Sequence, residues 1–368
     1  MNSSPPATTA FPLFQRFPQL EAAVPRVPLS PGASPVAPLA ALRRRLGGDE
    51  IWIKNDGLYG TLYGGNKPRK LEFLLADAQR RGARTVLTTG ALGTNHGLAT
   101  ALYAPQFGLK AVLLLTYEQP SADVARQLCR LQRAGAVLHY TGSLPRTVLL
   151  APYYILRYAS RGPWRWPYIL PPGGSTPLGA LGYVNAALEL AAQIDAGELP
   201  EPDTILAPLG SAGTAAGLLL GLRIAGLRSR LLPVAITRAP TAWAVAVARR
   251  ANAAARLLTR RGARLDIEPF RGRDVQVSRD WLSPGFGRAS FAGEEARVML
   301  RECEGLELDS TYTAKTMAAL IHLRRSGALP GRVLYWHTYN AIAPAPPEPA
   351  REDRERLPAE FQRFLQAL

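Results

Sequence analysis

The chain has 368 residues, about two to three times the usual size of one domain, so a small binding module is excluded and two domains are expected. Hydrophobic residues make up 47% and charged residues 20%, a balance typical of a globular protein and unlike that of a disordered or fibrous one. The net charge is +16, yet arginine pairs such as Arg80/Arg81 are dispersed, without a sustained basic helix or an RNA-binding signature. We therefore expect an arginine-rich surface and no nucleic-acid partner.

The two cysteines, Cys129 and Cys303, lie far apart and neither belongs to a CxxC motif, which excludes a disulfide framework and a structural zinc site. The 4 histidines also lack the spacing of metal ligands, so we expect no bound metal. The N-terminal stretch has no basic start followed by an apolar run, and the longest apolar stretches are too short to span a bilayer. We expect no signal, no membrane anchor and a cytoplasmic setting.

Short β-branched runs alternate with longer helical patterns, which predicts parallel strands joined by helical crossovers and an α/β fold class. The predicted strands are 50–54, 85–89, 110–116, 136–140, 168–171, 204–207, 231–237 and 332–337. The predicted helices begin near Lys67, Asn95, Ala122, Leu178, Gly213, Pro240, Gly293 and Thr313. A charged helix over 351–368 is expected after a proline-rich run.

The first informative stretch is Gly64-Gly-Asn-Lys-Pro-Arg-Lys70, where paired glycines lead into a predicted helix. Lys67 at the helix N-terminus feels the positive end of the helix dipole, and burial disfavours its charged form. Both effects lower its pKa and supply a free amine that can form a Schiff base. Lys70, on the same face, can sit beside Lys67 or beside an anion bound at the helix end. A purely structural loop is the alternative.

Two further glycine-rich turns follow predicted strands and open helices. In the stretch from Thr89 to Gly97, backbone N–H groups and the side chains of Thr94, Asn95 and His96 can bind an anion such as a substrate carboxylate, unless the turn only caps a helix. The stretch from Leu209 to Gly217 suits a phosphate group, but it has neither the ending of a P-loop nor the dinucleotide GxGxxG spacing. These patterns leave a phosphate-bearing cofactor other than a nucleotide open.

Five motifs in a fixed order resemble those of one enzyme family. They are Gly64-Gly-Asn-Lys-Pro-Arg-Lys-Leu-Glu72, Gly93-Thr-Asn-His96, Pro172-Gly-Gly-Ser-Thr-Pro-Leu-Gly-Ala-Leu-Gly-Tyr183, Gly210-Ser-Ala-Gly-Thr214 and Leu308-Asp-Ser-Thr-Tyr-Thr-Ala-Lys315. The sequence from about Pro25 to Ile342 resembles the pyridoxal-phosphate enzymes of the tryptophan-synthase-β type (fold type II), in the branch of D-cysteine desulfhydrase and 1-aminocyclopropane-1-carboxylate deaminase. The resemblance implies a two-domain, open, twisted parallel-sheet fold with pyridoxal 5′-phosphate in the cleft.

The resemblance also implies how the domains divide. A discontinuous large domain, 1–67 and 173–345, would bind the cofactor, a smaller α/β domain, 68–172, would be inserted into it, and 346–368 would form a helical tail. Because parallel sheets bind ligands at the carboxyl ends of their strands, the three glycine-rich turns are expected to meet at one site. Members of the family are usually dimers, so a homodimer is expected.

By the same resemblance, several residues are expected to hold the cofactor. Lys67 would carry it as a Schiff base and act as the base at the substrate α-carbon, Lys70 would contact its phosphate, and Asn95 would bond its ring hydroxyl. The loop expected around the phosphate consists of Gly210, Ser211, Ala212, Gly213 and Thr214. Thr313 would face the pyridine nitrogen as a neutral partner, where the deaminase branch has glutamate. A neutral pyridine suits α,β-elimination, so we predict no turnover of 1-aminocyclopropane-1-carboxylate.

Other residues are expected at the substrate. Thr94, where the family usually has serine, would contact the substrate carboxylate or move a proton, beside Asn95 and His96. Tyr312 corresponds to an active-site tyrosine, a candidate acid or base near the β-carbon.

Two positions depart from the family pattern. Phe286, in Pro-Gly-Phe-Gly, replaces a tyrosine, and Tyr339, in His-Thr-Tyr-Asn, replaces a small residue but brings a hydroxyl that can compensate in part. Both changes alter the expected pocket and indicate a substrate other than D-cysteine.

The expected function is that of a pyridoxal-phosphate-dependent lyase or deaminase, similar to D-cysteine desulfhydrase, that converts a small amino acid into a 2-oxo acid and ammonia by α,β-elimination. One alternative is an isomerase or β-replacement enzyme in a biosynthetic pathway, which product analysis would separate. Another is a non-catalytic protein that binds the cofactor or an amino acid. The intact Lys67 argues against that alternative, because a pure binder has little need for a reactive lysine.

Overall fold

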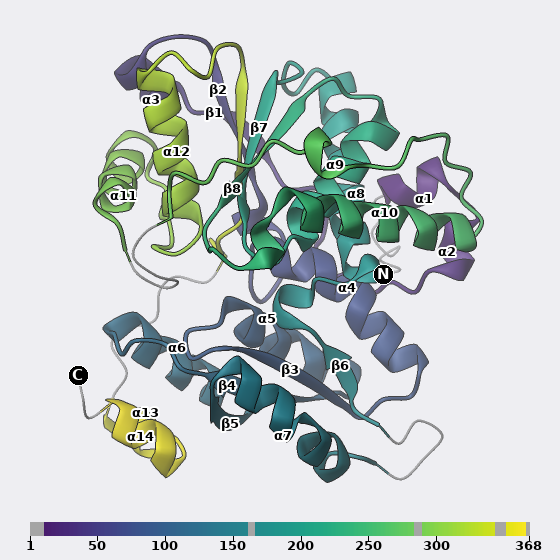
Figure 1. Cartoon of the computed structure of the whole chain (residues 1–368), viewed down its shortest axis with the longest axis vertical. Helices are drawn as coiled ribbons and strands as arrows, with labels where there is room; N and C mark the ends of the chain where they lie inside the picture. Colours follow the sequence, from purple (N-terminus) through teal and green to yellow (C-terminus); the bar gives the residue numbers. More distant parts are fainter. Residues whose placement is uncertain (1–10, 161–165, 283–288, 343–350, 366–368) are drawn as a thin grey trace, which may run out of the picture.

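Two separate sheets organise the residues that the computed structural model describes, which are 11–160, 166–282, 289–342 and 351–365 (Figure 1). The larger sheet has the order β1 (Val36–Pro38), β2 (Ile51–Asn55), β9 (Val333–His337), β7 (Thr204–Leu209) and β8 (Arg230–Ala235). The smaller has the order β5 (Val137–Gly142), β4 (Lys110–Thr116), β3 (Thr85–Ala91) and β6 (Tyr168–Leu170). All neighbouring pairs are parallel except β1 with β2, which confirms the α/β class.

Helices cover both faces of the larger sheet, and β7 shows why. Its side chains alternate between the two faces: Ile205 and Ala207 join the core on one side, and Leu206 joins the core on the other. The first core is built with α1 (Pro12–Arg16), α2 (Leu20–Ala23), α8 (Pro177–Asp195), α9 (Gly213–Ala225) and α10 (Ala244–Arg260). The second is built with α3 (Ala40–Leu46), α11 (Phe291–Glu304) and α12 (Thr313–Arg325).

The smaller sheet is also covered on both faces, and the apolar run of β4 is buried accordingly. Its larger core lies against α4 (Asn66–Arg80), α5 (Asn95–Tyr103) and α6 (Ala122–Arg133), and α7 (Leu144–Arg157) lies on the opposite face. Two short helices follow, α13 (Arg351–Glu355) and α14 (Ala359–Leu365). Leu357, between them, and Phe361, in α14, are buried in the same core of the smaller sheet as α4, α5 and α6. The short 3-10 helices are η1 (Asp56–Leu58), η2 (Ala104–Phe107), η3 (Pro172–Gly174), η4 (Pro240–Ala242) and η5 (Gly272–Asp274).

The chain therefore passes between the two sheets three times. The first passage runs from β2 through residues 63–67 into α4, the second follows β6 through residues 171–176, and the third leaves β9 toward α13. α4 itself contributes to both halves, because Leu71 and Leu74 lie in the core of the smaller sheet and Phe73 lies in a core of the larger one. The strands of the smaller sheet fall within the expected inserted segment, 68–172, and the domain boundaries stay a prediction.

The start of α4 is fixed by a buried ionic network. The guanidinium of Arg69 donates to Asp56 Oδ1 at 2.7 Å and to Glu189 Oε2 at 2.9 Å, and Lys54 Nζ donates to Glu189 Oε1 at 2.6 Å. All four side chains are buried. Because Arg69 follows Lys67 by two residues, the network sets the position of the first turn of α4 against α8 and η1.

All eight predicted strands are present, and α4, α5, α6, α8, α9, α11 and α12 begin within two residues of their predicted starts. Three differences stand out. The edge strand β1 and the helices α1, α2, α3 and α7 are additional, and the helix near Pro240 is the short η4 followed by α10 from Ala244. The expected single helix 351–368 is wrong: it divides into α13 and α14 at Pro358, since proline disfavours helical geometry in the residue before it.

Candidate active site

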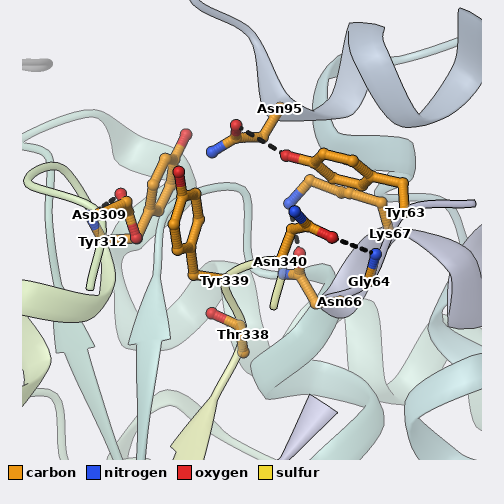
Figure 2. A pocket seen from close by; sticks show the side chains of 10 residues that line it. All are labelled: Tyr63, Gly64, Asn66, Lys67, Asn95, Asp309, Tyr312, Thr338, Tyr339 and Asn340. Carbon is orange, nitrogen blue, oxygen red and sulfur yellow. Dashed lines mark hydrogen bonds between the residues drawn. The ribbon is translucent and has the colours of Figure 1, made fainter. Parts of the chain in front are cut away.

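The three glycine-rich turns meet at one cavity of about 360 Å³, which is within the range of small-molecule sites. Its walls come from the first turn of α4, the β3–α5 turn, the segment after β4, η3, the β7–α9 turn and the start of α12. The convergence expected from the sequence is confirmed. A smaller pocket of about 20 Å³ adjoins it and shares the residues Asn66, Lys67, Asn95 and Tyr312 (Figure 2).

Lys67 lies where both pockets meet. Its Nζ donates to Asn66 Oδ1 at 2.6 Å and lies 5.8 Å from the centroid of the Tyr312 ring. Burial lowers the pKa of Lys67 to about 8, although the charge of Asp309 opposes the change. The lysine therefore carries a free amine at a lower pH than an ordinary lysine does, as the sequence predicted.

Lys70 lies deeper in the cavity, next to the start of α9. Its Nζ donates to the carbonyl of Gly173 at 3.1 Å, and a Cβ atom placed on Gly213 would lie 3.1 Å from it. Burial, followed by the charges of Lys67 and Arg250, lowers the pKa of Lys70. An ammonium buried beside the N-terminal end of a helix needs an anion, so this corner of the cavity fits a phosphate group.

The β7–α9 turn completes this corner. Ser211 Oγ and Ser175 Oγ are 2.7 Å apart, and a Cβ atom on Gly213 would lie 2.5 Å from Ser175 Oγ, so a larger residue at this position would displace the Ser175 side chain. Ala212 has a φ of 64°, the single positive φ of a non-glycine among the described residues. Thr214 Oγ1 accepts a hydrogen bond from Asn66 Nδ2 at 3.1 Å, which joins the turn to the first residue of α4.

Asn95, the first residue of α5, has an orientation fixed by two neighbours. Its Oδ1 accepts hydrogen bonds from Tyr63 Oη at 3.0 Å and from Gln127 Nε2 at 3.2 Å. Figure 2 shows its amide nitrogen turned away from Tyr63. Asn95 therefore presents a donor to the pocket, which suits an oxygen acceptor such as a ring hydroxylate.

Thr94 and His96 flank Asn95 and also line the cavity. Thr94 Oγ1 accepts a hydrogen bond from the N–H of Gly97 at 3.1 Å, so it caps α5 and keeps its own hydrogen to donate. His96 is buried, and neither of its ring nitrogens has a hydrogen-bond partner among the residues that the structure describes. Burial and the charges of Lys67 and Lys70 hold the pKa of His96 well below its usual range, so its ring is neutral.

Tyr312 and Thr313 open α12. Tyr312 lines both pockets, and burial, with the charges of Asp309 and Glu118, raises the pKa of its phenol, which stays protonated. Thr313 is fully buried, donates its hydroxyl hydrogen to Asp309 Oδ1 at 2.6 Å and accepts from the Asp309 N–H at 2.8 Å. Only a lone pair of the Thr313 hydroxyl is left for another group.

Tyr339, which departs from the family pattern, lines the smaller pocket beside Asp309 and Tyr312 (Figure 2). Its neighbour Asn340 accepts a hydrogen bond from the N–H of Gly64 at 2.6 Å, which fastens the segment after β9 to the turn before Lys67. Phe286 lies outside the described residues.

Sequence reasoning missed four residues of the site. Tyr63 and Gln127 orient Asn95, Asp309 accepts the N–H groups of Tyr312 and Thr313 at the start of α12, and Glu118 lines the cavity. Asp309 stands inside the motif from Leu308 to Lys315, and that motif is the signal that could have found it. The other three are brought in by tertiary folding, and no local pattern marks them.

The fold and the cavity define a class: a two-sheet α/β enzyme with a reactive lysine beside an anion site. The family model described as pyridoxal-phosphate dependent enzyme matches residues 27–338, and the chain belongs to this family. A D-cysteine desulfhydrase of Salmonella schwarzengrund is 35% identical over 336 residues, which cover 89% of this chain and 95% of the relative. A Pyrococcus horikoshii protein provisionally named 1-aminocyclopropane-1-carboxylate deaminase is 33% identical over 330 residues, which cover 87% and 93%.

Solved structures agree with this assignment. The crystal structure of an ACC deaminase homologue is 32% identical with a TM-score of 0.75 and covers 88% of this chain and 94% of that chain. A threonine deaminase from T.th. is 21% identical with a TM-score of 0.58, covers 92% and 100%, and shares the fold. The open parallel-sheet architecture expected from the sequence is confirmed.

The residues present fit the cofactor of the family. The lysine with a lowered pKa suits the aldehyde, the corner around Lys70 and Gly213 suits the phosphate, and the donor of Asn95 suits the ring oxygen. No group of three or more metal-binding side chains exists within the part of the chain that the structure describes. Its helices include none that is long and apolar enough to cross a membrane.

Proposed function

We propose that the protein is a pyridoxal-phosphate-dependent lyase that removes a β-substituent and the α-amine from a small amino acid, giving a 2-oxo acid and ammonia. The observation that carries the proposal is the position of Lys67, whose amine has a pKa of about 8 and lies between the phosphate corner and Tyr312. When bound, the cofactor withdraws electrons from the substrate α-carbon.

Residues of the chain move the protons and bind the substrate carboxylate. Lys67 takes the proton from the α-carbon, because its free amine is populated near neutral pH. The first N–H groups of α5, with Thr94 and the neutral His96, bind the substrate carboxylate. Tyr312, protonated at neutral pH, gives a proton to the group that leaves the β-carbon.

Lys70 and the loop from Gly210 to Thr214 hold the phosphate in this proposal, and Asn95 holds the ring oxygen. Thr313 is uncharged, donates its hydroxyl hydrogen to Asp309 and is not among the residues that line either pocket, so it brings no carboxylate to the pyridine nitrogen, where a glutamate would stabilise a protonated ring. This difference favours elimination over opening of a cyclopropane. Purified protein should therefore not turn over 1-aminocyclopropane-1-carboxylate, and sustained ammonia release from that compound would contradict the assignment.

The visible spectrum of the protein with added pyridoxal phosphate tests the proposal. The wild type should show an absorbance band that Lys67→Ala lacks and that Lys110→Ala, a change at an exposed lysine, retains. D- and L-cysteine, D- and L-serine and β-chloroalanine are then added, and ammonia and 2-oxo acid are measured. A band without any product would overturn the lyase assignment, and an inverted or β-substituted amino acid would replace it with an isomerase or a β-replacement enzyme.

The proposal includes a homodimer, in analogy with the family, and a cytoplasmic setting. The cytoplasmic setting is supported by Cys129 and Cys303, which form no disulfide, since reduced cysteines are usual in that compartment. Sedimentation equilibrium of the purified chain tests the homodimer.

A further inference from the structure

The C-terminal tail, α13 and α14, reaches the mouth of the cavity, although it follows the last strand of the larger sheet. The mouth consists of the residues that line the cavity and are also exposed to solvent, which among the described residues are Tyr117, Leu144, Pro172 and Thr241. Tyr117 directly follows β4 and is 57% exposed. Phe364, in α14, contacts it: the two ring centroids lie 5.4 Å apart, with the rings edge to face.

The tail is attached to the smaller sheet by contacts that do not involve Tyr117. Figure 1 shows α13 and α14 against this sheet, away from the larger one. Leu357 and Phe361 are buried in its core, and Glu360 Oε1 accepts a hydrogen bond from the N–H of Tyr140, in β5, at 3.1 Å. α14 is therefore a fixed support on which the side chain of Tyr117 can rest.

The sheet fixes the backbone of Tyr117, and Phe364 restrains its ring. The N–H of Tyr117 donates to the carbonyl of Gly142 at 2.7 Å, which continues the pairing of β4 with β5. An aromatic pair in an edge-to-face arrangement is more favourable than its buried area alone, so the contact with Phe364 stabilises one orientation of the Tyr117 ring. Loss of the Phe364 ring would let the Tyr117 side chain turn about χ1 and χ2 while its backbone stays in place.

We infer that Phe364 is a positioning residue that holds the Tyr117 ring across the mouth, so that the C-terminal tail controls how fast ligands enter and leave the cavity. The inference goes beyond the proposed reaction, because a ligand passes the mouth whatever chemistry follows. It also assigns a task to a segment that lies beyond residues 27–338, the part of the chain that the family model matches. Motion at the opening of a site commonly limits the exchange of ligand.

A side chain that obstructs an opening affects rates and equilibrium differently. When the Tyr117 ring is released, the open arrangement is populated more, and association and dissociation accelerate by the same factor. The dissociation constant is then unchanged, because it is the ratio of the two rate constants. A loss of contacts with the ligand instead raises the dissociation constant, mainly through faster release.

Pyridoxine 5′-phosphate, which lacks the aldehyde of the cofactor, tests the inference on the full-length, cofactor-free chain. It forms no covalent bond with Lys67, so stopped-flow fluorescence measures its entry and release without any turnover. The variants are Phe364→Ala, Tyr117→Ala and the double variant, and Phe364→Leu keeps an apolar side chain in α14 if Phe364→Ala folds poorly. Arg363→Ala is the matched control, because Arg363 is an exposed neighbour in the same helix.

In Phe364→Ala, the association and dissociation rate constants should both rise by roughly three- to tenfold, and the dissociation constant should change by less than about twofold. Phe364→Leu should show a smaller rise of both, and Arg363→Ala should match the wild type. In the Tyr117→Ala background, Phe364→Ala should add nothing, because the ring that it would release is absent.

Unchanged rate constants in Phe364→Ala and Phe364→Leu would overturn the inference, and so would an equal acceleration by Phe364→Ala in the Tyr117→Ala background. A higher dissociation constant that comes from faster release alone would also overturn it, since Phe364 would then stabilise the bound complex instead of restricting its exchange. None of these outcomes depends on ammonia or 2-oxo acid, so the lyase proposal stands or falls separately.

Discussion

Lys67 differs from a surface lysine because burial disfavours its ammonium form. Its pKa of about 8 lies below the ordinary value of 10.5, so its amine becomes free as the pH rises through 8. The rate at which added pyridoxal phosphate produces the lysine-dependent absorbance band should rise through pH 8 and level off above it. Stopped-flow absorbance from about pH 6 to about pH 11 measures this dependence. A midpoint near 10.5 would show that Lys67 is solvated like a surface lysine.

Thr94 has a structural task that can be separated from its proposed contact with substrate. Its hydroxyl caps α5 by accepting the Gly97 N–H. Thr94→Ala should lower the free energy of unfolding of the cofactor-free chain by about 1 kcal/mol, and Thr94→Ser, which keeps the hydroxyl, should lower it much less. Urea denaturation compares the two, and an equal loss in both would assign the effect to the methyl group of Thr94 instead.

At the level of elements, the stability of α4 depends on the buried Glu189. Removal of one partner from a buried ion pair costs about 3–5 kcal/mol, so Glu189→Gln, which takes the paired carboxylate from Lys54 and leaves Arg69 with Asp56 alone, should lower the free energy of unfolding by about that amount. The exposed pair Arg45–Glu302 offers the control, because Glu302→Gln should cost less than about 1 kcal/mol. Similar losses in the two variants would contradict the role of burial.

The same network makes a prediction about acid. Burial opposes the charge of Glu189, but Arg69 and Lys54 lower its pKa to about 2, below the ordinary 4.5. A carboxyl with a lowered pKa stabilises the fold above its unfolded pKa, and this contribution is lost as the pH falls from 4.5 toward 2. The slope of unfolding free energy against pH should therefore be smaller in Glu189→Gln over this window. An unchanged slope would mean that other carboxyls dominate acid unfolding.

Elements with a strong periodic pattern could be predicted from the sequence, and the missed ones show why others could not. β1 contains Pro38, has three residues and lies at an edge of the sheet, so neither length nor alternation marks it. α7 contains Pro152, which conceals its helical pattern, although Ser143 caps its start. The starts of α4, α5 and α9 were predictable because glycine or a capping side chain stands at each of them.

The candidate site was predictable to the extent that its residues stand in local motifs. Lys67, Asn95 and the turn before α9 belong to such motifs and converge on the cavity. Gln127, from the middle of α6, and Glu118, after β4, reach it only because the smaller sheet folds as it does. Whether such residues reach the cavity depends on how the strands pair and in which register. No short stretch of sequence determines that pairing.

At the scale of the whole molecule, the cofactor connects the two halves, because the cavity has walls from both. A ligand that binds the folded chain alone stabilises it by about 2.7 kcal/mol at a concentration one hundred times its Kd. Pyridoxal phosphate should raise the free energy of unfolding by this amount in the wild type and by less in Lys70→Ala, which weakens the phosphate corner. Chemical denaturation at several cofactor concentrations measures the effect. Equal stabilisation in the two proteins would place the phosphate elsewhere.

The three passages of the chain between the sheets have a mechanical consequence. Each passage from one sheet to the other includes residues that border the pockets. These residues are 63–67, 172–173 and 338–340. Any rocking of one sheet over the other therefore pivots at the site itself. A ligand bound in the cavity contacts both halves and restricts this motion. Amide hydrogen exchange in the three segments should therefore slow together when the ligand binds, and the slowing should increase with the bound fraction.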